Sequence, residues 1–136
     1  MIVPLADTLP ALEWITDSRV ERLSQDFYWF SPVLKRQLEG LRADAVVRPK
    51  TEDEIRAVVA GSASALVPIT VRGSGTGNYG QCMPLHGGVI LDLSAYNKLL
   101  WVQQGIGRAQ AGIRMMEFDR QARQAVQDPD RRLGLG

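Results

Sequence analysis

The alternation of apolar and polar positions predicts strands and helices in the middle of the chain. Residues 45–47 and 67–71 are short apolar runs with β-branched side chains, which are typical of strands. Between them, Thr51 and Glu54 have the T-x-x-E spacing of a capping box and precede an apolar stripe at helical spacing, formed by Ile55, Val58 and Val59. Strand, helix and strand in this order predict a βαβ unit with two parallel strands and a right-handed crossover.

Further strands and one helix are predicted after this unit. The segments 88–93 and 99–102 and the weaker segment 107–111 indicate strands joined by short turns. A helix is expected to begin near Ile113, with one apolar side formed by Met115, Phe118, Ala122 and Ala125. We therefore expect an α+β fold in which the βαβ unit is followed by short antiparallel strands.

Short helices are expected before the βαβ unit, within residues 7–40. Asp17 or Ser18 can cap a first helix that carries apolar residues at helical spacing, namely Val20, Leu23 and Phe27. Ser31-Pro32 indicates the start of a second helix, with a capping serine and proline at the first helical position. The aromatic residues 27–30 could form a ligand platform, but aromatic side chains dominate core burial, so we expect them to pack.

Composition places the chain among globular proteins and argues against several kinds of partner. The chain has 136 residues, which fits one domain, and 16 basic against 15 acidic side chains give a net charge of +1. This balance gives no electrostatic reason to expect nucleic acid or an anionic membrane as a partner. The single Cys82 excludes an internal disulfide and an all-cysteine zinc site. No apolar run has membrane-spanning length and the first residues do not resemble a signal peptide, so we expect a cytoplasmic protein.

The most informative segment is the glycine-rich stretch that follows the second predicted strand. Four glycines fall within residues 73–80. Glycine allows a positive φ and a close approach to a ligand, and successive N–H groups turned toward one point form a concavity that suits an anion. The stretch is therefore either a binding loop for a phosphate-bearing cofactor or an ordinary glycine-rich turn between two strands.

The spacing of these glycines matches a known nucleotide motif, but the following residues do not. Gly75-x-Gly77-x-x-Gly80 has the form G-x-G-x-x-G, which requires a helix that begins inside the motif. Pro84 and the glycine pair 87–88 would break such a helix. A P-loop is excluded because no Gly-Lys-Ser/Thr follows. The stretch must therefore bind an anion through its backbone, from irregular structure.

Three segments together resemble one flavoprotein family. They are Pro49-Lys50-Thr51-Glu52-Asp53-Glu54-Ile55, Arg72-Gly73-Ser74-Gly75-Thr76-Gly77 and Gly88-Val89-Ile90-Leu91-Asp92-Leu93-Ser94. The combination resembles the FAD-binding domain of the vanillyl-alcohol oxidase and p-cresol methylhydroxylase flavoproteins, most closely the branch of glycolate oxidase and D-lactate dehydrogenase. We expect a helical amino-terminal segment in 1–40, a partial FAD-binding domain of this type in 41–125 and an irregular tail in 126–136.

The resemblance implies that the glycine loop wraps the diphosphate of FAD with its amides. The residues expected to bind the cofactor are Arg72, Gly73, Ser74, Gly75, Thr76, Gly77, Asn78, Gly80 and Gln81. Two roles remain open for Arg72, which could face a phosphate or brace the loop by binding carbonyls. Some family members carry a histidine in this loop that is bonded covalently to the flavin. Thr76 stands at that position here, so the resemblance implies non-covalent FAD.

Three side chains near the loop are interpreted as structural. Asp92 is expected to bind local backbone amides rather than the cofactor. His86 could be a base and Cys82 lies close to the expected cofactor, but we interpret them as a surface residue and a small buried thiol. We therefore assign no catalytic residue and no metal ligand.

The carboxyl-terminal end departs from the family pattern. The family has a further strand, a second glycine-rich segment and a substrate domain there, whereas residues 126–136 are polar and contain Pro129. The resemblance implies the amino-terminal FAD-binding portion of an oxidoreductase that passes a hydride from a 2-hydroxy acid to FAD. Its partner would be the missing carboxyl-terminal part or another subunit. The alternative is a catalytically inactive fragment that acts only as a nucleotide-binding or interaction module.

Overall fold

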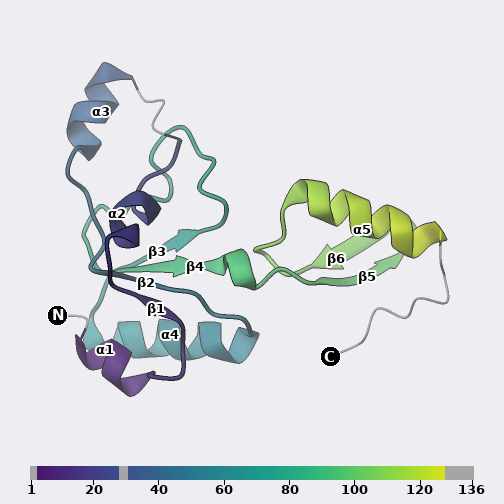
Figure 1. Ribbon diagram of the computed structural model, residues 1–136, viewed down its shortest axis with the longest axis horizontal. Helices are drawn as coiled ribbons and strands as arrows, with labels where there is room; N and C mark the ends of the chain where they lie inside the picture. Colours follow the sequence, from purple (N-terminus) through teal and green to yellow (C-terminus); the bar gives the residue numbers. More distant parts are fainter. Residues whose placement is uncertain (1–2, 28–30, 128–136) are drawn as a thin grey trace.

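The computed structural model describes residues 3–27 and 31–127. A four-stranded sheet forms the larger part, with α1 (Val3–Thr8) and α4 (Glu52–Ala65) on one face and α2 (Arg19–Leu23) on the other (Figure 1). A smaller unit extends from one end of this sheet. It consists of the two-stranded sheet of β5 (Leu99–Gln103) and β6 (Ile106–Ala109) with α5 (Met115–Gln127) against it.

The larger sheet contains the predicted βαβ unit with one strand inserted into it. The strand order is β1 (Trp14–Ile15), β2 (Ala45–Val47), β4 (Val89–Asp92) and β3 (Ile69–Arg72). Strands β2 and β3 both pair in parallel with β4, so they run in the same direction, as predicted, without being neighbours. Strand β1, which was not predicted, pairs antiparallel with β2 at the edge.

The position of β4 corrects one expectation. The strand at 88–93 was expected to begin a series of antiparallel strands, whereas β4 is parallel to both of its neighbours, and among the strands after β3 the antiparallel pair is β5 with β6. A chain that leaves the end of one strand must return along the sheet before it can start a parallel neighbour. Residues 73–88 make this return between β3 and β4 without a helix, which agrees with the prediction that none fits there.

Local signals explain helix α4. The Thr51 hydroxyl accepts a hydrogen bond from the Glu54 amide at 3.2 Å, and the Glu54 carboxylate accepts one from the Thr51 amide at 3.3 Å, which confirms the capping box. Val58 is fully buried beneath the sheet, whereas Val59 is 45% exposed. The apolar stripe is therefore narrower than the sequence pattern predicts.

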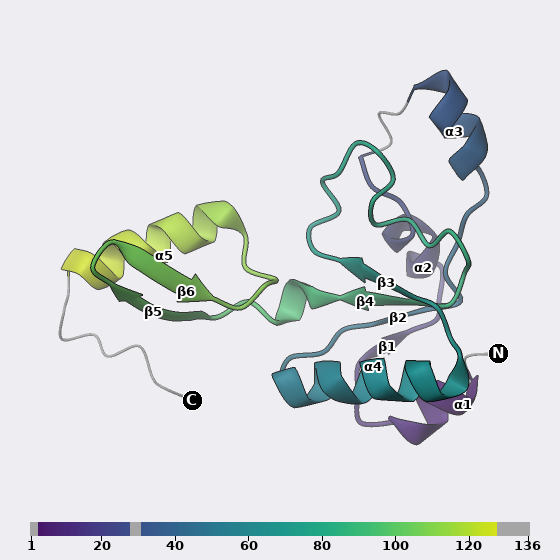
Figure 2. The same cartoon turned by 180° about the vertical axis from the view of Figure 1, so that it is seen from behind.

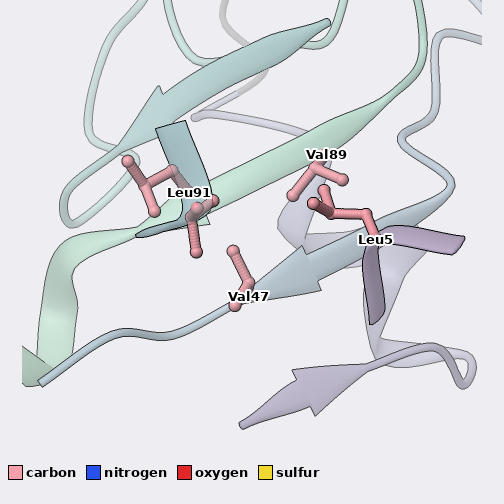
Figure 3. Close-up of a cluster of buried hydrophobic side chains, with 5 residues drawn as sticks. Leu5, Val47, Val89 and Leu91 are labelled. Carbon is pink, nitrogen blue, oxygen red and sulfur yellow. The ribbon is translucent and has the colours of Figure 1, made fainter. Parts of the chain in front are cut away.

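Two apolar clusters cover the two faces of the sheet. One consists of Leu5, Val47, Val58, Val89 and Leu91, and Figure 3 shows four of these side chains meeting between α1 and the strands. The other consists of Ile15, Val20, Ala43, Val46 and Ile90. Neighbouring residues along β2 and β4 belong to different clusters because side chains alternate across a strand. Burial on both faces is typical of parallel sheets and explains the nearly continuous apolar runs in these strands.

The helices of the amino-terminal segment agree with the prediction in outline. Helix α3 (Pro32–Leu38) begins as expected, with the Ser31 hydroxyl accepting from the Leu34 amide at 3.2 Å and proline at its first turn. Helix α2 starts after Ser18, whose side chain makes no capping bond; the Asp17 carboxylate accepts from the Arg19 amide at 2.9 Å instead.

The aromatic residues 27–30 are described only in part. Phe27 is 56% exposed, so the expected packing does not hold at this position. Its place beside the glycine loop, rather than on the sheet, explains the exposure, since its amide donates to the Gly77 carbonyl at 3.2 Å. Residues 28–30 lie outside the described part of the chain.

The smaller unit lies at the opposite end of the molecule from α1 (Figure 2). The 3₁₀ turn Leu93–Ala95 connects β4 to it. Helix α5 begins at Met115, two residues after the expected start, and ends at Gln127. The first two residues of the expected tail, 126 and 127, are therefore helical, and residues 128–136 lie outside the described part.

Gly88 provides a test of how the return loop enters β4. It has φ +72°, and a Cβ there would lie 2.2 Å from the Pro68 carbonyl oxygen. We expect Gly88→Ala to lower the free energy of unfolding by about 3 kcal/mol, because strain and a backbone clash combine. Gly105 has φ +80° with nothing within 4 Å, so Gly105→Ala should cost only about 1 kcal/mol. Urea denaturation measures both, and equal losses would contradict the expectation.

Candidate functional site

The glycine loop begins where β3 ends, at the carboxyl edge of the parallel strands. Gly73 and Ser74 line a cavity of about 480 Å³ together with residues that follow β4 and residues at the start of α5. Open α/β sheets bind ligands at this edge. The two segments of the chain that flank the cavity, β4 with its following turn and the start of α5, come from the larger and the smaller unit respectively.

Six consecutive amides of the glycine loop are not used by the fold. The N–H groups of residues 73–78 donate to no acceptor among the described residues. The next two amides are used, since Tyr79 donates to the Gln81 side chain at 3.1 Å and Gly80 donates to the Asp26 carboxylate at 2.8 Å. Backbone amides need partners, so the six available groups can bind solvent or an anion.

The Arg72 side chain holds the start of the loop through hydrogen bonds to backbone carbonyls. Its guanidinium nitrogen Nη1 donates to the carbonyl of Leu23 at 3.1 Å and to that of Gln25, and it lies 3.4 Å from the sulfur of Cys82. The loop folds closely over this guanidinium, because a Cβ on Gly75 would lie 2.1 Å from Nη2. Of the two roles predicted for Arg72, the carbonyl-binding one is present in the structure, and contact with a phosphate remains a prediction.

The end of the predicted site is packed against the protein itself. The Gly77 carbonyl accepts from the Phe27 amide at 3.2 Å. Gly80 has φ +78°, and a Cβ there would lie 2.6 Å from a methyl group of Leu38. The Gln81 side chain points back to the loop and lies where a Cβ of Gly77 would be, at 2.4 Å. The left-handed φ of Gly80 and its contact with Leu38 therefore explain this glycine even in the absence of a ligand.

Gly73 differs from the other glycines of the loop. Its φ is outside the left-handed region, and a Cβ built there would meet nothing within 4 Å. Neither backbone strain nor packing within the described structure requires glycine at this position. Close approach of a ligand would require it.

A partly buried ion pair of Asp92 with Arg48 contributes to the cavity lining. Asp92 is 2% exposed, and its carboxylate accepts from the Ser94 amide at 3.0 Å and receives two hydrogen bonds from Arg48, at 2.8 and 3.0 Å. Arg48 also pairs with Glu13 at 3.0 Å. The prediction that Asp92 binds a local amide is confirmed, but its ion pair with Arg48 was missed. Both residues end apolar strand segments, and this shared position is a signal that could have identified the pair.

The cavity lining as a whole carries more positively than negatively charged side chains. Arg22, Arg48, Arg72 and Arg114 line it, together with Asp92 and Glu117. The side chains of Arg22 and Arg114 donate to no acceptor within the described ranges, so their charges are available to a ligand. Hydrogen bonds from Arg120 and then Gln121 lower the pKa of Glu117 to about 2, so this carboxylate stays charged at neutral pH.

Cys82 and His86 occupy the places expected for structural residues. Cys82 is 8% exposed, and burial raises the pKa of its thiol. His86 is an exposed residue of the return loop. Residues 3–27 and 31–127 contain no group of three or more histidine, cysteine, aspartate or glutamate side chains that could hold a metal ion.

The family follows from a comparison of sequences. A family model described as "FAD binding domain" matches residues 43–129, which is more than half of the chain. The chain belongs to this family of FAD-binding domains, which confirms FAD as the cofactor and the resemblance to p-cresol methylhydroxylase-type flavoproteins.

No helix in the part of the chain that the structure describes is long and apolar enough to cross a membrane.

Curated relatives are oxidoreductases. An uncharacterized oxidoreductase from the fasciation locus of Rhodococcoides fascians is 36% identical over 69 residues. An uncharacterized FAD-linked oxidoreductase of Mycobacterium tuberculosis is 30% identical over 74 residues. These matches cover 51% and 53% of this chain and 16% of each relative, so the chain spans a small part of their length.

Solved structures share the fold at low sequence identity. An alkyldihydroxyacetonephosphate synthase superposes on 91% of this chain and 27% of its own, with a TM-score of 0.77 and 19% identity. A p-cresol methylhydroxylase superposes on 83% of this chain and 22% of its own, with a TM-score of 0.59 and 16% identity. The predicted fold class is confirmed. These relatives do not single out the branch of glycolate oxidase and D-lactate dehydrogenase, which remains a prediction.

Proposed function

We propose that this chain is the diphosphate-binding part of a FAD-linked oxidoreductase and that residues 73–78 hold the diphosphate. The observation that carries this proposal is the run of six amides without acceptors in the described structure, at the carboxyl edge of a parallel sheet. A hydrogen bond from an amide to a charged oxygen contributes about 1.5–3 kcal/mol. Several such bonds can bind a diphosphate without a helix terminus.

The residues of the cavity fit an anionic dinucleotide. Gly73 leaves open space beside the first free amide. The guanidinium groups of Arg22 and Arg114, which have no acceptor among the described residues, provide positive charge on the cavity lining. The Asp92 carboxylate also lines the cavity, but its ion pair with Arg48 at 2.8 Å and its hydrogen bond from the Ser94 amide at 3.0 Å weaken its repulsion of a phosphate. Charge and space therefore both favour binding at the start of the loop.

The proposed reaction is oxidation of a 2-hydroxy acid. Bound flavin would supply the hydride acceptor in this chemistry. The part of this chain is to bind the cofactor and fix its orientation through the loop amides. The substrate class rests on the sequence resemblance, and fold similarity to a synthase does not bear on it because one fold supports several reactions. The rest of the flavoenzyme or another subunit is the proposed partner, and a cytoplasmic location remains a prediction.

Gly73→Ala tests the binding site. The substitution should leave the urea midpoint of the chain without FAD nearly unchanged, because the added methyl group meets no protein atom. It should weaken FAD binding about tenfold or more, since the methyl group would stand between the amide and the diphosphate. Titration of FAD, followed by quenching of flavin fluorescence, gives the affinity.

The control for this variant is Gly105→Ala, which adds the same methyl group in the turn between β5 and β6. It should lower stability slightly and leave FAD affinity unchanged. Wild-type affinity in Gly73→Ala would exclude the proposed position of the diphosphate.

Thr76 predicts that FAD is held without a covalent bond. Its side chain lies in the loop and cannot form the histidyl bond that some family members make. Trichloroacetic acid should therefore release all flavin into the supernatant, and the protein band on a denaturing gel should show no flavin fluorescence. Flavin that stays with the precipitate would show that another residue is attached to it.

Reduction of the bound flavin by a substrate would distinguish an enzyme from a binding module. If the chain alone or with its proposed partner oxidises a 2-hydroxy acid, glycolate or D-lactate should bleach the flavin absorbance under anaerobic conditions. D-Alanine, which has an amino group in place of the hydroxyl group of D-lactate, serves as the control. Full flavin uptake without bleaching by any 2-hydroxy acid, even with the partner present, would favour the module.

A further inference from the structure

The segment 23–27, which begins at the last residue of helix α2, lies along the glycine loop. Both views of the fold show the loop between β3 and β4 on the same side of the sheet as α2 (Figures 1 and 2). At the start of the loop, Arg72 donates to the carbonyls of Leu23 at 3.1 Å and of Gln25. These carbonyls are the acceptors that fix the direction in which the loop leaves β3.

The same segment holds the other end of the loop. The Asp26 carboxylate accepts a hydrogen bond from the Gly80 amide at 2.8 Å. The Phe27 amide donates to the Gly77 carbonyl at 3.2 Å. The six free amides thus lie between two attachment points on one short segment. Both attachments join residues about fifty positions apart in the chain.

We propose that the segment 23–27 is a clasp that holds the glycine loop in its FAD-binding shape and that Asp26 is its positioning residue. This inference rests on the proposed function of the loop. The clasp lies outside residues 43–129, which match the family model. The amino-terminal segment therefore contributes to the cofactor site although it lies before the FAD-binding domain in sequence.

A clasp should strengthen FAD binding because a glycine-rich loop is otherwise flexible. Ordering a backbone residue costs about 1–2 kcal/mol, and glycine loses more freedom than other residues. A loop that the protein already holds in place avoids most of this cost when the ligand binds. Removal of the clasp should therefore weaken FAD binding although no contact to FAD itself is lost.

Asp26 exerts two effects of opposite sign, and they can be separated. Its hydrogen bond to Gly80 supports the shape of the loop, whereas its negative charge, 3.6 Å from where a Cβ of Gly77 would lie, repels a diphosphate. Asp26→Asn keeps an acceptor oxygen and removes the charge. Asp26→Ala removes both.

The test compares these two variants in FAD titration and in amide hydrogen exchange without FAD. Asp26→Ala should weaken FAD binding about tenfold and speed exchange of the Phe27 and Gly80 amides, which are hydrogen-bonded between the clasp and the loop. Asp26→Asn should bind FAD at least as tightly as wild type, with exchange close to wild type. Asp17→Ala is the control, because Asp17 also accepts from a backbone amide, at 2.9 Å, but at the far end of α2. It should change neither measurement.

Arg72→Lys probes the other attachment point. Lysine keeps the charge but lacks the planar group that reaches both carbonyls, so this variant should weaken FAD binding and speed exchange as Asp26→Ala does. Wild-type exchange in both Asp26→Ala and Arg72→Lys would overturn the clasp, as would equal loss of FAD affinity in Asp26→Asn and Asp26→Ala. If wild type takes up no FAD, the proposed function fails, and with it the clasp as a device for binding, whatever the exchange shows.

Discussion

The return of the chain from β3 to β4 is the constraint on which the rest of the structure depends. The two strands are parallel neighbours, so residues 73–88 must cross back along the sheet. Helices usually make such crossovers and satisfy their own amides. Here the crossover is irregular, so its amides need other partners. The same segment therefore connects two parallel neighbours and presents donors without acceptors in the described part of the chain, and the proposed binding site is a consequence of how the sheet is connected.

An irregular crossover is useful as a site only if it is held in one shape. Arg72 fixes its start through two carbonyls, and Asp26 fixes Gly80 at 2.8 Å. The crossover ends at Gly88, whose amide donates to the Asp44 carboxylate at 2.9 Å while its carbonyl accepts from the Asp44 amide at 2.8 Å. These attachments leave the amides of residues 73–78 without acceptors among the described residues. Rigid supports around a short set of free donors are what a preorganised binding site requires.

The parts that could be predicted from sequence are those with local signals. The capping box of Thr51 and Glu54, the apolar strand segments and the glycine loop each lie within a few residues, and each is present. The order of strands could not be predicted in this way, because an apolar run such as 89–91 indicates a buried strand but does not identify its neighbours in the sheet. The two-residue strand β1 is too short to show any alternation. The ion pair of Arg48 with Asp92 joins residues 44 positions apart, and only the fold brings them together.

The glycines show how folding and binding are combined in one motif. A Cβ at Gly75 or Gly80 would collide with Arg72 or Leu38, and both glycines have a positive φ, so the fold alone explains them. Gly73 has neither constraint. A glycine-rich pattern by itself therefore cannot separate a tight turn from a binding loop, and both interpretations stay open for this reason until the fold is known. The distinction appears only when each glycine is compared with the atoms around it. Within the loop, the glycine that the protein's own packing does not need, Gly73, is the one that lines the cavity.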